Sequence, residues 1–95
     1  MSSSYKIYGC VLPLDGRKND MVSVMQLHDL DYLTDQATGS IRFWQHYIVP
    51  DIIVSDIAPL VKSGTITVAD IKTNDSIRLE LHNGKVSLCN EGENE

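Results

Sequence analysis

The side chains best able to do chemistry in this sequence are its thiols and imidazoles, which belong to Cys10, Cys89, His28, His46 and His82. A thiol becomes a nucleophile when a nearby base or cation stabilises its thiolate. In a predicted C-terminal hairpin, Cys89 falls opposite Arg78, and His82 lies on the same ribbon. Cys89, His82 and Arg78 therefore form one candidate site. The simpler interpretation puts Cys10 in the core and Cys89 at the end of an edge strand, so no catalytic residue is assigned.

Metal and phosphate sites need closely spaced ligands or clustered glycines. The densest group of possible metal ligands is His28, Asp29, Asp31 and Asp35. It lacks the glycine and the distal glutamate of a calcium-binding loop, so a solvated acidic helix face or loop is the preferred interpretation. The six glycines are scattered singly, so neither glycine-rich phosphate motif is present. We expect no metal ion and no cofactor.

Nucleic-acid binding requires basic side chains gathered on one surface. The chain has 8 Lys and Arg against 13 Asp and Glu, a formal net charge of −5, and its basic residues are dispersed. Arg17 and Lys18 are the one adjacent pair. Nucleic acid is therefore not expected as a partner.

The aromatic group in the middle of the chain is the best candidate for a binding surface; its members are Phe43, Trp44, His46 and Tyr47. In a strand, Phe43 and Tyr47 would share one face, whereas Trp44 and His46 would share the other. One face could then meet a helix while the other meets a partner chain. Tryptophan and tyrosine are enriched at the centres of protein interfaces. A segment covered on both sides by this chain alone is the competing structural interpretation.

The strongest local signal is a hairpin over residues 77–89. Apolar and polar residues alternate on both sides of Asn83 and Gly84, a pair that suits a type I′ turn because both positions need positive φ. His82 would then pair with Lys85. One face, expected to be buried, would carry Ile77, Leu79, Leu81, Val86 and Leu88.

The remaining elements are less sharply marked. Strands are predicted over residues 5–12, 21–27, 41–49 and 65–71, and the last of these makes a three-stranded meander with the hairpin. A helix capped by Ser40 is the alternative for 41–49. Helices are predicted near residues 55–63, with Gly64 just past the end, and in a second candidate near 28–36.

Composition favours a sheet. The 95 residues are 42% hydrophobic, with nine Ile, eight Val and five Thr against three Ala. β-Branched side chains suit a pleated sheet and alanine suits a helix. We predict a single α+β domain over residues 1–95: an antiparallel sheet of about five strands, packed by one or two short helices. Residues 1–4 and 90–95 are expected to be flexible tails.

These features together predict a small acidic protein-interaction module. It would act without catalysis, as a regulator, inhibitor or accessory factor that binds another protein. Apolar residues on both faces of the predicted strands 5–12 and 21–27 also allow a homodimer. No leader or membrane-spanning run is seen, so we expect a cytoplasmic protein, in the host cytoplasm for a viral or phage gene. The alternative is a small enzyme or ligand-binding protein with a Cys/His or His/Asp site.

Overall fold

The computed structural model describes residues 4–89, which form one six-stranded antiparallel sheet, two α-helices and a short 3-10 turn. The strands are β1 (Tyr5–Pro13), β2 (Asp31–Thr34), β3 (Ile41–Ile48), β4 (Val61–Asp70), β5 (Ser76–His82) and β6 (Lys85–Cys89). The helices are α1 (Lys18–Leu27), α2 (Pro50–Ile57) and the 3-10 turn η1 (Ala58–Leu60). This is the α+β sheet with short helices that composition predicts. None of the described helices is long and apolar enough to cross a membrane.

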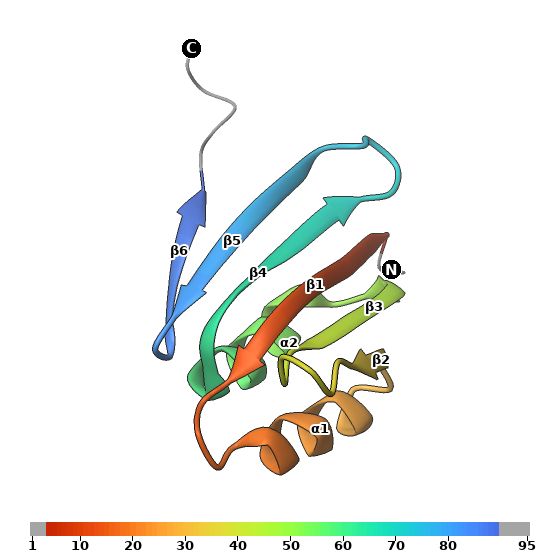
Figure 1. Cartoon of the computed structure of the whole chain (residues 1–95). Helices are drawn as coiled ribbons and strands as arrows, with labels where there is room; N and C mark the ends of the chain where they lie inside the picture. The colour runs from red at the N-terminus through yellow and green to blue at the C-terminus, as the bar shows by residue number, and fades with distance from the viewer. Residues whose placement is uncertain (1–3, 90–95) are drawn as a thin grey trace.

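The strand order is β2-β3-β1-β4-β5-β6. The first four strands and both helices follow the order β-α-β-β-α-β, in which β3 lies between β2 and β1 as in split β-α-β units. The last two strands continue the sheet beyond β4 as the predicted meander. In Figure 1 the helices gather on the side of β1, β2 and β3, and the β5–β6 ribbon projects away from them.

The core lies on one face of the sheet, between the strands and the two helices. Alternate residues of the central strands point into it, and the fully buried ones include Ile7, Val11, Ile41, Phe43 and Ile66. The helices contribute pairs at i, i+4 spacing, Met21 with Met25 and Ile53 with Ile57. Among residues 4–89, no helix lies on the opposite face of the sheet.

The predicted strand over residues 21–27 is wrong, because this segment is part of α1. Met21 and Met25 are fully buried while Ser23 between them is exposed. A strand would point all three side chains to one face, whereas a helix places only residues at i and i+4 together, so the burial pattern fits the helix. The helix candidate at 28–36 is also wrong, since β2 occupies Asp31–Thr34 and pairs with β3.

The predicted helix at 55–63 is displaced toward the N-terminus. Pro50 lies in the first turn of α2, where its missing N–H costs nothing, and Pro59 lies in η1, where the α-helix has ended. Gly64 belongs to β4 and does not cap a helix. Residues 41–48 form a strand, as expected, and exclude the alternative helix.

The C-terminal hairpin is confirmed residue by residue. His82 pairs with Lys85, Leu81 with Val86 and Leu79 with Leu88. Asn83 has φ of 49° and Gly84 has φ of 83°, as a type I′ turn requires. The backbone N–H groups of both turn residues donate to β4 carbonyl groups, at 2.8 and 2.9 Å, so the turn is tied to the sheet.

We predict that Gly84→Val lowers the free energy of unfolding by about 1–2 kcal/mol, the cost of holding an L-residue in the left-handed region. A Cβ atom at this position would meet nothing closer than 3.6 Å, so the cost is conformational and not steric. Urea denaturation measures it. Gly84→Asn is the matched control, because asparagine tolerates positive φ. A Gly84→Val protein as stable as wild type would contradict the turn assignment.

Candidate functional site

Two surfaces of the sheet are uncovered among the described residues. The first, here called the open face, is the face opposite the helices. It displays the side chains that alternate with the core positions, so its central strands present Lys6, Tyr8 and Cys10 from β1, Arg42, Trp44 and His46 from β3, and Thr65 and Thr67 from β4. The neighbouring strands add Asp31 and Leu33 from β2, Arg78, Glu80 and His82 from β5, and Lys85 and Ser87 from β6.

Two aromatic rings stand at the centre of the open face. Tyr8 on β1 and Trp44 on β3 are direct partners on these two neighbouring strands. Tyr8 is 45% exposed and Trp44 is half-buried, so both rings keep accessible surface. The Lys6 Nζ atom lies 6.0 Å from the centroid of the Tyr8 ring, at the outer limit of a cation–π contact.

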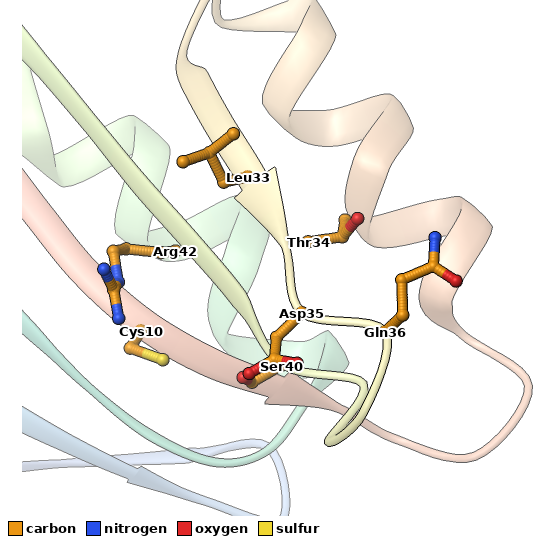
Figure 2. Close-up of a pocket in the computed structure, with 7 residues that line it drawn as sticks. All are labelled: Cys10, Leu33, Thr34, Asp35, Gln36, Ser40 and Arg42. Atoms are coloured by element: carbon orange, nitrogen blue, oxygen red, sulfur yellow. The ribbon is translucent and has the colours of Figure 1, made fainter.

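A shallow groove of about 340 Å³ runs between these rings and the flanking cations. Its walls include Tyr8, Trp44, Arg42 and Arg78, and the hydroxyls of threonines on β4 lie along it. A second hollow, of about 350 Å³, adjoins it and shares Cys10 and Arg42. Figure 2 shows Arg42 beside Cys10, with Asp35 and Ser40 on the adjoining β2–β3 turn.

The charge of the open face differs from that of the whole chain. Its strands carry four basic side chains, those of Lys6, Arg42, Arg78 and Lys85, against the acidic side chains of Asp31 and Glu80. The protein as a whole has a formal net charge of −5. Basic residues that are dispersed along the chain thus meet on one surface. No carboxylate of residues 4–89 forms an ion pair with Arg42.

The expectation that Cys10 is a core residue is wrong. Its position in β1 alternates with Ile7 and Val11, which point into the core, so its thiol points to the open face and is exposed. Its strand is apolar on both faces, and sequence alternation alone does not tell which face the helices cover.

The four predicted interface residues separate in space. Phe43 is fully buried under the helices, whereas Trp44 and His46 point to the open face. Tyr47 is 71% exposed and sits in a β-bulge: Tyr5 pairs with Ile48 and Lys6 with His46, which leaves Tyr47 without a partner in β1. Its φ of 57° is unusual for a bulky residue. The bulge turns Ile48 toward the core and places the Tyr47 ring 6.5 Å from that of His46.

The second predicted site is only partly assembled. Arg78 and Cys89 are backbone partners, as expected, but the Cys89 side chain lies outside the described part of the structure. His82 is four residues along β5, about 13 Å away at strand spacing. The ring of His28 instead contacts Asp56 of α2, with Nε2 and Oδ2 2.7 Å apart. Within residues 4–89 no group of three or more His, Cys, Asp or Glu could hold a metal ion.

The second uncovered surface is a part of the core face that the helices do not reach. We call it the apolar shelf; it consists of Ile77, Leu79, Val86 and Leu88 on β5 and β6. Ile77, Val86 and Leu88 are 51%, 44% and 53% exposed. The expectation that the whole apolar face of the hairpin is buried is therefore wrong, because Leu81 alone is fully covered, at 2% exposure.

The sequence predicts which residues share the shelf, but not that the shelf is open. The alternation of apolar and polar residues along these strands is identical to that of a hairpin whose apolar face is buried. The number of helices and strands nevertheless indicated an open surface, because two short helices are together too narrow to cover a sheet of six strands.

Comparison of the chain with protein-family models, with curated proteins and with solved structures finds no match.

Proposed function

We propose that the chain is a non-enzymatic protein-binding module, a regulator, inhibitor or accessory factor, whose apolar shelf receives an amphipathic helix of a partner protein. The observation that carries this proposal is the exposure of three large aliphatic side chains on the core face of the sheet. An apolar patch of this kind on a small domain marks an interaction surface.

The size of the shelf favours a helix as the occupant. Neighbouring strands lie about 4.8 Å apart, so β5 and β6 together offer a floor about 10 Å wide, the diameter of one helix. The segment α2–η1 forms a wall beside this floor. Val49 and Pro50 line a hollow with Ile77 at one end, and the Pro59 backbone approaches Gly84 at the other. A helix laid parallel to this wall would complete the helical layer over the sheet.

Charge adds a preference for a basic partner. Asp51 lies beside Ile77 in the hollow at the start of α2, and Asp75 lies beside Ile77 at the start of β5. Both residues are exposed. Lysine or arginine at the corresponding end of the partner helix would face two carboxylates. Residues 90–95, which follow β6, contain no apolar side chain and are poorly suited to cover the shelf.

We place this module in the cytoplasm.

A second copy of the chain is the competing occupant of the shelf, since two shelves related by a two-fold axis could pack on each other. Multi-angle light scattering separates the two. A monomer leaves the shelf free for a foreign helix. A dimer that dissociates in the Leu88→Glu variant would show that a second copy of the chain occupies the shelf.

We predict that Leu88→Glu lowers the affinity for a shelf-binding helix at least tenfold while the fold stays intact. The exposed half of the leucine loses about 1 kcal/mol of burial, and a carboxylate enters an apolar contact. Ser87→Glu is the matched control, because the neighbouring side chain points to the open face. Circular dichroism and urea denaturation verify that both variants are folded.

The probe for this test is a synthetic 14-residue helical peptide with leucines on one face and lysines at one end. Amide NMR shifts on its addition are expected at residues 77–79 and 85–88, and Leu88→Glu but not Ser87→Glu should remove them. Shifts elsewhere, or equal effects of the two variants, would contradict the proposal. With the wild-type and Leu88→Glu proteins as baits, cross-links at β5 and β6 identify a native partner.

A further inference from the structure

We propose that the open face is a second, separate binding site, which takes single-stranded nucleic acid by stacking unpaired bases on Tyr8 and Trp44. The phosphates would lie against Lys6 and Arg42. This site is on the opposite side of the sheet from the apolar shelf, so it does not depend on the protein-binding function proposed above.

The placement of the two rings supports stacking. Tyr8 and Trp44 are direct partners on the neighbouring strands β1 and β3, on the sheet face opposite the described helices. Side-chain partners on neighbouring strands have Cβ atoms about 5 Å apart. The rings can therefore serve consecutive bases of one strand. Every base offers a π-face, so this recognition tolerates many sequences.

The neighbouring charges support a polyanion. The Lys6 ammonium lies over the Tyr8 ring, and Arg42 lies two residues before Trp44 on the same face of β3, so each aromatic ring has a cation near it. Arg78 lines the far side of the same groove. A groove that combines aromatic rings with cations along a track is the usual arrangement for unpaired nucleic acid.

The character of the rest of the surface separates this ligand from a protein partner. Thr65 and Thr67 line the groove between the rings and Arg78, and Thr65 is exposed. Leu33, on the edge strand β2, is an exposed aliphatic side chain of the open face, whereas Ile77, Val86 and Leu88 form the exposed aliphatic group of the apolar shelf. A duplex is also a poor ligand, because its bases are already stacked and a flat sheet face carries no element that enters a groove.

The dispersion of basic residues along the sequence argues against this ligand, and the fold removes that objection. Lys6, Arg42 and Arg78 are far apart in the chain, yet β3, β1 and β5 lie within four consecutive strands of the sheet, β3-β1-β4-β5. Their alternation with core residues points all three to the same side.

The test uses the fluorescence of Trp44, which is the only tryptophan of the chain. Mixed-sequence 12-nucleotide single strands of RNA and of DNA are titrated at low salt, with the matched duplex, inorganic phosphate and AMP as further arms. We expect both single strands to quench Trp44, with Kd of about 10⁻⁴ to 10⁻⁶ M. We expect the duplex, phosphate and AMP to bind at least tenfold more weakly.

Two substitutions assign the contacts. Tyr8→Ala should lower the affinity for the single strand roughly 5- to 100-fold, because one stacking platform is lost. Tyr5→Ala is its matched control, because Tyr5 lies on the same strand with similar exposure, 40% against 45%, but on the other face. Arg42→Ala should reduce the slope of log Kd against log salt by about 0.7, the value for one phosphate of a single strand. Leu88→Glu should leave the affinity for the single strand and its salt dependence unchanged.

Several results would overturn the proposal. One is no quenching by any oligonucleotide at low salt with the wild-type protein. Another is equal binding of the duplex, which would show charge attraction without stacking. A third is equal loss of affinity in Tyr8→Ala and Tyr5→Ala. A poly-glutamate peptide that quenches Trp44 as strongly, with the same dependence on Tyr8 and Arg42, would assign the face to acidic protein segments. None of these results bears on helix binding at the apolar shelf.

Discussion

Phe43→Ala is expected to lower the free energy of unfolding by about 3–5 kcal/mol, the range for removing a buried aromatic side chain. Phe43 is fully buried at the centre of β3, where it faces the helices. A domain of this size is stable by about 5–15 kcal/mol, so the loss removes a large share of the total. Urea or thermal denaturation followed by circular dichroism measures it.

Trp44→Ala is the natural comparison, since Trp44 is the next residue of the same strand and points to the open face. Because the Trp44 ring is half-buried, its removal should lower the free energy of unfolding clearly less than removal of the Phe43 ring does. If Trp44→Ala destabilised the protein as much as Phe43→Ala, then Trp44 would be a structural residue and the open face would lose its central platform. If Phe43→Ala left stability unchanged, the burial of Phe43 would be contradicted.

Gly9→Ala is expected to destabilise the protein by about 3 kcal/mol, at the upper end of the range for overpacking. Gly9 lies in β1 between Phe43 on β3 and Ile66 on β4. A Cβ atom here would clash with the carbonyl oxygen of Thr65 and would lie 3.0 Å from the Ile66 Cα. Both obstacles are backbone atoms, so relief requires β1 and β4 to move apart.

Cys10→Ala controls for alanine in the same strand, because residue 10 has an exposed side chain and no such constraint. We expect it to change stability by less than about 0.5 kcal/mol. The cost at Gly9 is measured by denaturation, and amide hydrogen exchange should show faster exchange along β1 and β4. A Gly9→Ala protein with wild-type stability would mean that the two strands do not approach as closely as they do here.

Local patterns were sufficient where all the information lay within a few neighbouring residues. The hairpin is an example, because the turn needs positive φ at Asn83 and Gly84, and alternation on both sides then sets the register. For residues 41–48 the β-branched and aromatic side chains favoured a strand and left a helix capped by Ser40 open, and the structure decides for the strand.

Local patterns failed where burial by distant elements decided the outcome. Residues 21–27 contain a short alternating run, yet in α1 Met21 and Met25 enter the core while Ser23, which a strand would point to the same face, is exposed. The bulge at Tyr47 likewise has no marker in the sequence. It interrupts the alternation that would place Tyr47 with Phe43, so one of the predicted interface residues is exposed and the other is buried.

The amino-acid sequence alone was enough to establish an α+β domain with an antiparallel sheet and a C-terminal meander, because propensity and turn chemistry are local. It could not establish which face of each strand the helices cover. That depends on where two short helices pack, and two helices cannot cover six strands. Tertiary packing therefore left Ile77, Val86 and Leu88 uncovered as the apolar shelf and brought Lys6, Arg42 and Arg78 around Tyr8 and Trp44.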